Sequence, residues 1–213
     1  AEALVESYFG VLEKGVFEKR EKSIDFAHLS LLRKKPIEQV HLAIGYPTIH
    51  RDHPLAYALQ TMNSVLGGSM SSRLFQEVLG LAYSVYSYIS AFSECGSLIV
   101  YAGVNPSSAD KAYYAIGKVI AELMEKGISE EEFLRGREQM KASMLFSQES
   151  TPSQMLLYGK YMLFNDRLFD FEGKLDAINR MTKEDANETI ALTFDDSRKA
   201  VGAVGNLDKP FAL

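Results

Sequence analysis

The sequence predicts an α+β fold in which helices pack on one face of an antiparallel sheet. Two observations lead to this prediction. Segments with the two-residue alternation of strands and segments with the period of amphipathic helices occur in separate runs, in the order strand, helix, two strands, several helices, strand. A short polar turn joins the two consecutive strands, which is typical of an antiparallel hairpin.

The N-terminal 37 residues are expected to lie outside this sheet-and-helix domain. Residues 1–15 have an apolar stripe of helical spacing, with Gly15 just past its end. Residues 16–37 mix charged and apolar side chains without a sustained period, so we interpret them as a linker with room for one short strand. The domain itself is expected to cover 38–213.

The first half of this domain alternates between strand and helix signals. V-H-L-A-I-G-Y from Val40 predicts a half-buried strand that ends near Pro47. Pro54 suits a first helical turn, and the helix that follows should stop at Gly67 and Gly68. Residues 82–92 and 97–104 then alternate as the two strands of the hairpin.

The second half is mostly helical. Asn105-Pro106 supplies an N-cap and a first-turn proline for a helix that Gly127 should end. Ser129 with Glu132 has the spacing of a capping box at the start of a long helix. Further helices are expected from Thr151-Pro152 and from Thr182, and residues 198–204 should form a final strand.

Composition excludes several classes of function. Hydrophobic residues make up 46% of the 213 residues, charged residues 24%, and the net charge is −5. The acidic balance gives no electrostatic footprint for nucleic acid. No segment approaches the 18 apolar residues of a membrane span. The chain lacks a basic leader and starts within a helical pattern, so we expect a fragment of a longer polypeptide.

Cys95 is the single cysteine. It excludes an internal disulfide and fits a reducing compartment, so we expect a cytoplasmic protein. In an apolar strand we expect its thiol to be buried and inert.

The four histidines do not form a metal-binding pattern. His50 and His53 are three residues apart, but Pro54 follows at once, which places the pair before a helix rather than on one face of it. A zinc site also needs a third ligand and ordered outer partners. The inverted motif H-x-x-E-H, which holds zinc and a general base on one helix, is absent. We expect a loop and helix cap here, and no metal in this chain.

Other candidate sites also have simpler explanations. No G-x-S-x-G element is present, and Cys95 has no histidine close in sequence. Glu130, Glu131 and Glu132 fall in a first helical turn, where backbone amides stabilise negative charge, so a solvated cap is favoured over an acidic site.

Three tyrosines remain open to two interpretations. Tyr86 and Tyr88 share one face of the expected strand, and Tyr83 lies at the opposite parity near its start. They are either sheet packing or donors to a bound peptide, because a phenol at a strand end can donate to a peptide carbonyl.

The segment from Ser72 to Val85 resembles a known family. It reads S-R-L-F-Q-E-V at 72–78 and G-L-A-Y-S-V at 80–85. These motifs are similar to the signature of the second, zinc-free half of the pitrilysin, insulinase and mitochondrial-processing-peptidase family of zinc metallopeptidases. The resemblance covers roughly residues 38–206. Residues 1–15 resemble the last helix of the zinc-bearing half, and 16–37 the linker between the halves.

One departure from the family pattern affects the site. In the family, an arginine seven positions before the tyrosine joins it in contacting peptide, but here Leu79 and Gly80 follow Val78 directly. About three residues are therefore missing, either because the loop is shorter or because a stretch is missing from the sequence as given. The closely matching flanks favour the second. The resemblance implies that Tyr83 contacts substrate, with Arg73 as a second candidate that is also a structural one.

The resemblance implies the second half of a processing-peptidase-like zinc metalloendopeptidase. This half would close the proteolytic chamber and orient peptide substrate, while the zinc would sit in the missing half. Expected partners are that zinc-bearing half or a partner subunit, a peptide substrate, and a second copy through self-association. The alternative is an inactive family member that acts as a structural or peptide-binding subunit, because fold alone does not establish activity.

Overall fold

The computed structural model describes residues 1–13, 15 and 26–213. Its described strands form one five-stranded sheet in the order β1-β5-β2-β4-β3. All neighbouring strands run antiparallel except β1 and β5, which are parallel. The α+β fold class predicted from the sequence is confirmed. The strands are β1 (Leu29–Lys34), β2 (Val40–Thr48), β3 (Ala82–Ala91), β4 (Gly96–Val104) and β5 (Ala200–Gly205).

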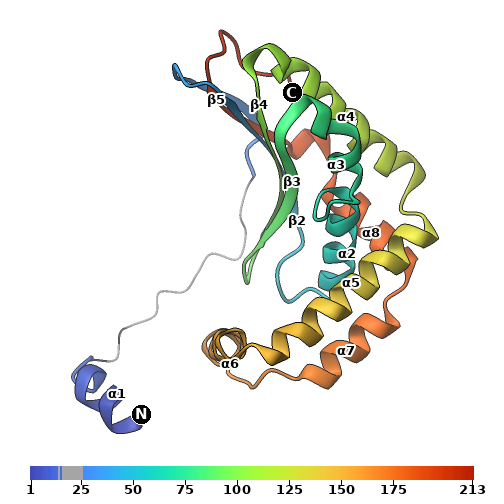
Figure 1. The fold of residues 1–213 in the computed structure, drawn as a ribbon. Coiled ribbons are helices and arrows are strands. Elements are labelled where there is room, and N and C mark those ends of the chain that lie inside the picture. The colour runs from blue at the N-terminus through green and yellow to red at the C-terminus, as the bar shows by residue number, and fades with distance from the viewer. Residues whose placement is uncertain (14, 16–25) are drawn as a thin grey trace.

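Helices cover one face of the sheet, and Figure 1 shows the other face without a helix against it. In β2 every second side chain is buried, from Val40 to Tyr46, which is the pattern of a strand with one covered face. Met62 and Ile116 are among the fully buried helix residues of the same core. The helices are α2 (Ala56–Leu66), α3 (Arg73–Val78), α4 (Ala109–Lys126), α5 (Glu130–Glu149), α6 (Thr151–Asn165), α7 (Phe171–Arg180) and α8 (Lys183–Thr193), with α1 (Glu2–Phe9) near the N-terminus.

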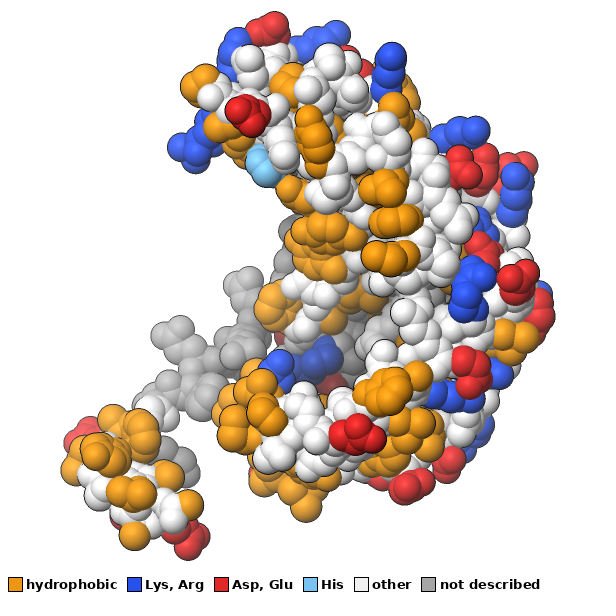
Figure 2. All heavy atoms as spheres, viewed as in Figure 1, with side chains coloured by type: hydrophobic (Ala, Val, Ile, Leu, Met, Phe, Trp, Pro, Cys, Tyr) orange, Lys and Arg blue, Asp and Glu red, His pale blue; other side chains and the backbone are white. Residues whose placement is uncertain are grey.

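The helices α5, α6 and α7 extend beyond the sheet. Figure 1 shows α5 running from the helix layer to α6 and α7, and Figure 2 shows a hollow between this arm and the open face of the sheet. The side chain of Ser129 and the backbone of Glu132 form the expected capping box at the start of α5. A second capping box, Thr182 with Asp185, starts α8. Both predicted helix starts are confirmed.

The turn after α2 brings the helix end against β3. Gly67 donates its backbone N–H to the carbonyl of Asn63 and accepts a hydrogen bond from Ser87 N–H at 3.1 Å. A Cβ atom at Gly67 would lie 2.6 Å from the backbone nitrogen of Ser87, so the approach requires glycine. This turn fixes the middle of β3 relative to the helix layer.

The N-terminal segment differs from the expectation in two respects. The helix expected over 1–15 ends at Phe9 and is capped by Gly10 instead of Gly15, and it buries none of its residues. Residues 29–34 form the short strand for which the expected linker had room, but this strand, β1, pairs with β5 at the edge of the sheet, so the sheet begins before the expected domain start at residue 38. The expected linker residues 16–25 lie outside the described residues.

Two other expectations are corrected. The sequence did not predict α7, which begins after the N-cap Asp170. Cys95 is partly exposed rather than buried, because it lies in the turn between β3 and β4 and not within a strand.

Candidate functional site

The open face of the sheet carries a patch of tyrosines that we call the tyrosine patch: Tyr86, Tyr88 and Tyr101. Tyr86 in β3 pairs with Tyr101 in β4, and their ring centroids are 5.0 Å apart. The rings of Tyr86 and Tyr88 are 6.1 Å apart. Tyr86 and Tyr88 are 44% and 45% exposed, so the rings contact one another without being buried.

A strip of small residues lies beside the tyrosine patch. Ala43 pairs with Tyr101 across β2 and β4, and with Gly202 across β2 and β5. Two residues further along β2, Gly45 pairs with Ala200 of β5. A Cβ atom placed at Gly202 would meet nothing within 4 Å. The open face therefore offers an aromatic surface next to small residues of β2 and β5, over which no other described side chain packs.

Tyr101 is positioned by a histidine. His41 Nδ1 and the hydroxyl of Tyr101 are 2.7 Å apart. Partial burial and the neighbouring Tyr86 raise the pKa of Tyr101, so its phenol stays protonated at neutral pH. A protonated phenol is a hydrogen-bond donor, and with His41 it places polar groups beside the exposed rings of Tyr86 and Tyr88.

Tyr83 lies at a bulge near the start of β3. The register shifts between Ala82 and Ser84, which leaves Tyr83 as the extra residue of the strand. Strict alternation would have placed Tyr83 on the helix-covered face, but at this bulge its side chain is 64% exposed. Among the described residues, no hydrogen bond or ring contact joins it to another side chain. The phenol is therefore free to donate to a ligand.

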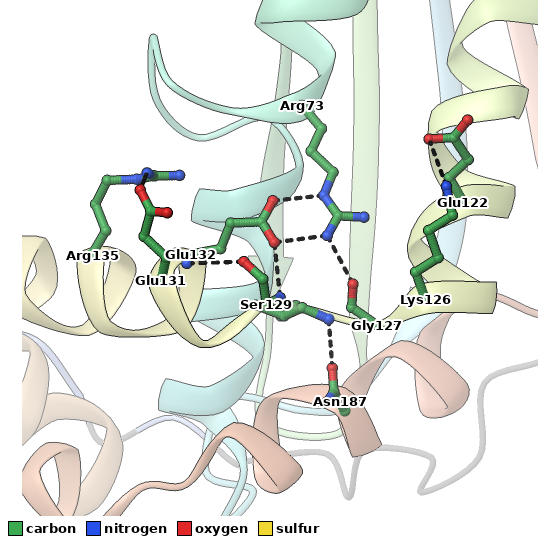
Figure 3. Close-up of polar contacts among 10 residues, drawn as sticks. Arg73, Glu122, Lys126, Gly127, Ser129, Glu131, Glu132, Arg135 and Asn187 are labelled. Carbon is green, nitrogen blue, oxygen red and sulfur yellow. Dashed lines mark hydrogen bonds and ion pairs between the residues drawn. The ribbon is translucent and has the colours of Figure 1, made fainter.

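Arg73 is held by a different part of the molecule. Its Nε and one terminal nitrogen each donate to Glu132 at 2.8 Å, and the same terminal nitrogen donates to the carbonyl of Gly127 at 2.8 Å (Figure 3). The side chains of Arg73 and Glu132 are only 21% and 17% exposed. These contacts tie α3 to the start of α5, which supports the structural interpretation of Arg73. No hydrogen bond connects Arg73 with Tyr83 in the described part of the chain.

Glu132 is the most perturbed carboxyl group near this contact. Partial burial favours its neutral form, but hydrogen bonds from Arg73 and Ser129 outweigh that effect and lower its pKa to about 2. Glu132 is thus ionised at neutral pH and is engaged with its own neighbours. The interpretation of Glu130, Glu131 and Glu132 as a helix cap agrees with the capping box that starts α5.

The histidines do not provide a zinc site. The rings of His50 and His53 meet edge to face at 5.6 Å, and His53 Nδ1 accepts a hydrogen bond from the backbone N–H of Leu55. Among residues 1–13, 15 and 26–213, no three histidine, cysteine or carboxylate groups lie close enough to hold a metal ion. The donor set does not fit zinc. We therefore derive no zinc chemistry from this chain.

Comparison with known proteins identifies the family. The family model described as "Peptidase M16 inactive domain" matches residues 1–140. The chain belongs to the peptidase M16 family, as the inactive domain. The zinc-metallopeptidase resemblance noted in the sequence is thereby confirmed.

Relatives of this M16 inactive domain carry protease names. The chain is 38% identical over 202 residues to the uncharacterized zinc protease YmxG of Bacillus subtilis, covering 89% of this chain and 49% of that protein. It is 34% identical over 173 residues to an uncharacterized zinc protease of Streptomyces coelicolor, covering 80% and 38%. The chain therefore spans half or less of the length of these relatives.

Solved structures share the fold. A peptidase M16 inactive domain from Pseudomonas fluorescens matches with a TM-score of 0.83 and 22% identity, over 97% of this chain and 51% of that one. A protease from Helicobacter pylori matches with a TM-score of 0.78 and 20% identity, over 95% and 51%. At these identities the likeness concerns the fold alone.

Some residues of the site were missed by sequence reasoning. Tyr101 and His41 lie 60 residues apart and meet only through the β2–β4 register, which the sequence does not specify. The alternation of residues 97–104 could have shown that the side chain of Tyr101 lies on the other face of the sheet from the buried side chains of Val100 and Ala102. Arg51 before α2 and the basic residues Lys160, Arg167 and Lys174 of the α6–α7 region line one pocket, and the sequence carried no motif that would have grouped them.

Proposed function

We propose that this M16 inactive domain forms the second half of a zinc metalloendopeptidase, where it closes the proteolytic chamber and orients the peptide substrate. The observation that carries the proposal is the open sheet face. Tyr83, Tyr86 and Tyr88 are exposed on β3, and Figure 2 shows a hollow between this face and the arm formed by α5, α6 and α7. The zinc would be held by the other half of the enzyme; the relatives named zinc proteases are about twice as long as this chain or longer.

Peptide would be held on the open face by two kinds of contact. Tyrosine rings offer apolar surface to peptide side chains, and phenol hydroxyls donate to peptide carbonyls. Tyr83 is suited to the second task because the bulge leaves its hydroxyl without a partner among the described residues. Arg73 is the weaker candidate for substrate binding, since its guanidinium donors are used by Glu132 and Gly127.

Kinetics of the complete enzyme test this proposal. Loss of one positioned hydrogen bond in Tyr83→Phe should lower kcat/KM for a peptide about tenfold, or ~1.4 kcal/mol in transition-state stabilisation. Tyr114→Phe is the matched control, because Tyr114 is equally exposed on α4, in the helix layer on the other side of the sheet. An unchanged kcat/KM in Tyr83→Phe would contradict a role in substrate binding and leave sheet packing as the role of Tyr83.

The same assay separates the enzyme from the alternative, a structural or peptide-binding subunit. If the partner half carries H-x-x-E-H and the pair cleaves peptide, the protease proposal stands. If the partner lacks that motif and no peptide is cleaved, the chain is a scaffold. Intact-mass measurement of the native protein shows in addition whether residues, including the family arginine, follow Val78.

The cellular location is also a proposal. The single cysteine, Cys95, supports a cytoplasmic protein. Within the described residues, none of the helices has the length and apolar character to cross a membrane.

A further inference from the structure

A basic pocket lies where the start of α2, the tip of the β3–β4 hairpin, α6 and the start of α7 meet. Its volume is about 560 Å³. Five charged side chains line it: Arg51, Asp52, Lys160, Arg167 and Lys174. Four of them are basic and one is acidic, although the chain as a whole has a net charge of −5. The sign of the pocket is thus opposite to that of the molecule.

Most of the positive charge in this basic pocket is not neutralised. Arg51 contacts Asp52 at 3.1 Å, and this is the one ion pair that the four bases form among the described residues. Partial burial would raise the pKa of Asp52, but hydrogen bonds from Arg51 and Asn165 outweigh it and keep the pKa low, so the pair is fully charged. Lys160, Arg167 and Lys174 leave three positive charges in excess.

Aromatic rings hold two of the bases in place. The guanidinium carbon of Arg51 lies 4.8 Å from the ring centroid of Phe164. Lys174 Nζ lies 5.7 Å from the centroid of Tyr57 and 5.8 Å from that of Tyr161. Such contacts position a cation without neutralising it. The pocket therefore combines ordered positive charge with apolar ring surface, which suits an anionic group next to an apolar one.

The basic pocket is linked to the open face through β3. Phe92, which lines the pocket, follows the last residue of β3, and Tyr83 lies near the first. Nine residues of strand span roughly 30 Å at about 3.3 Å per residue. Figure 2 shows basic side chains at the base of the hollow below the sheet. An extended peptide of about nine residues that follows β3 would thus reach from Tyr83 to the pocket.

We infer that the basic pocket binds an acidic segment of the peptide substrate, one in which carboxylates flank an aromatic or aliphatic side chain. This inference rests on the proposed function, because it takes the open face to be the peptide-binding face. It adds a substrate preference of the enzyme: the preferred peptide would carry an acidic segment about nine residues away from the peptide residue that contacts Tyr83.

Binding to the 213-residue chain tests the pocket directly. The probes are two fluorescently labelled peptides of equal length, one with a Glu-Phe-Glu segment and one with Gln-Phe-Gln, measured by anisotropy. We expect Lys160→Gln with Arg167→Gln to weaken binding of the acidic peptide at least tenfold. Both side chains are exposed, so both should be replaceable without loss of folding, which a thermal melt checks.

The matched control removes the same charge elsewhere. Lys111→Gln with Lys209→Gln changes two exposed lysines that do not line the basic pocket. This control should bind the acidic peptide as the unmodified chain does. Equal affinity for both peptides, or equal weakening by both double variants, would overturn the inference. Displacement of the acidic peptide by millimolar inorganic phosphate alone would show a general anion site and would also overturn it.

A second readout distinguishes failure of the inference from failure of the proposed function. In the complete enzyme, the Lys160/Arg167 variant should keep its cleavage of the Gln-Phe-Gln peptide and lose its preference for the acidic one. Cleavage of both peptides without preference contradicts the pocket alone. Binding of the acidic peptide without any cleavage contradicts the protease proposal and leaves the pocket standing.

Discussion

Arg73 shows how one side chain can hold several elements together. Its guanidinium joins α3 to the carboxylate of Glu132 in α5 and to the carbonyl of Gly127 in the turn before it (Figure 3). Two parallel hydrogen bonds to one carboxylate give a planar, oriented contact that lysine cannot reproduce. The role inferred from this geometry is to fix the helix layer.

Removing this contact should destabilise the fold. We expect Arg73→Met to lower the free energy of unfolding by about 1.5–3 kcal/mol, because a partly buried carboxylate loses its charged donor. Arg33→Met is the control, since Arg33 is exposed on the edge strand β1 and should change stability by less than about 0.5 kcal/mol. Urea unfolding at pH 7 measures both, and equal effects would contradict the structural role.

The same contact predicts a pH dependence. The folded-state pKa of Glu132 is about 2, below the ordinary value of 4.5 for a glutamate side chain, so the folded state binds fewer protons and protonation favours unfolding. The stabilisation is complete above about pH 4.5 and is lost as pH falls towards 2. The stability difference between the unmodified protein and Arg73→Met should therefore shrink between pH 5 and pH 3. A difference that stays constant over this range would contradict it.

At the scale of elements, the turn between α4 and α5 depends on a glycine. Gly127 has φ +67°, and a Cβ atom there would lie 2.9 Å from Asn187 Oδ1. That side chain accepts a hydrogen bond from Ile128 N–H at 2.8 Å and so ties the turn to α8. Arg73 donates a hydrogen bond to the carbonyl of Gly127 in the same turn, so the turn is held both to α3 and to α8.

Two glycine substitutions should have opposite effects. Gly127→Ala should cost about 1–3 kcal/mol in the free energy of unfolding, because alanine is strained at positive φ and would displace Asn187. Gly117→Ala, inside α4 with nothing within 4 Å of its Cβ position, should gain about 0.5–1 kcal/mol. Thermal or urea unfolding of both variants checks this, and equal signs would contradict the account.

The elements that the sequence predicted share a local signal, and those it missed lack one. The helices that begin after Ser129 and Thr182 could be predicted because each starts with a capping box, a pattern contained within four consecutive residues. In contrast, α7 is only ten residues long, and four of these are charged and one is glycine. The bulge at Tyr83 comes from the pairing of β3 with β4, which is a tertiary feature.

The site follows the same division between local and tertiary information. Tyr83 and Arg73 were found through a contiguous motif, but the sequence could not show that Arg73 binds Glu132, 59 residues away. The basic pocket gathers Arg51 from before α2 and Lys160, Arg167 and Lys174 from the α6–α7 region, more than 100 residues apart. Only the fold brings these charges together.

At the scale of the whole molecule, the chain should be metal-free by itself. Its described residues offer no group of three metal ligands, and His53 already accepts a backbone hydrogen bond. After chelator washing we expect less than about 0.1 zinc ion per chain, and we expect no peptide cleavage by the chain alone. Elemental analysis that finds one tightly held zinc per chain would contradict this.

The open face should also govern association. Tyr83, Tyr86 and Tyr88 are exposed on β3, an edge strand of the sheet, and Figure 2 shows further apolar side chains around the hollow. An exposed patch of this kind favours burial against a partner. We expect the chain to self-associate or to bind the zinc-bearing half through the face near Tyr83, with higher mass in light scattering as concentration rises.

Substitutions on the two sides of the sheet make this last prediction specific. Tyr86→Ser with Tyr88→Ser removes two rings from the open face and should weaken association at least tenfold, since burying an aromatic side chain contributes about 1.5–3 kcal/mol. Tyr114→Ser with Met124→Ser removes exposed apolar surface of α4 and should leave association unchanged. A chain that stays monomeric at high concentration and ignores added zinc-bearing half would contradict the prediction. Equal loss in both double variants would show that association follows general hydrophobicity and not the face near Tyr83.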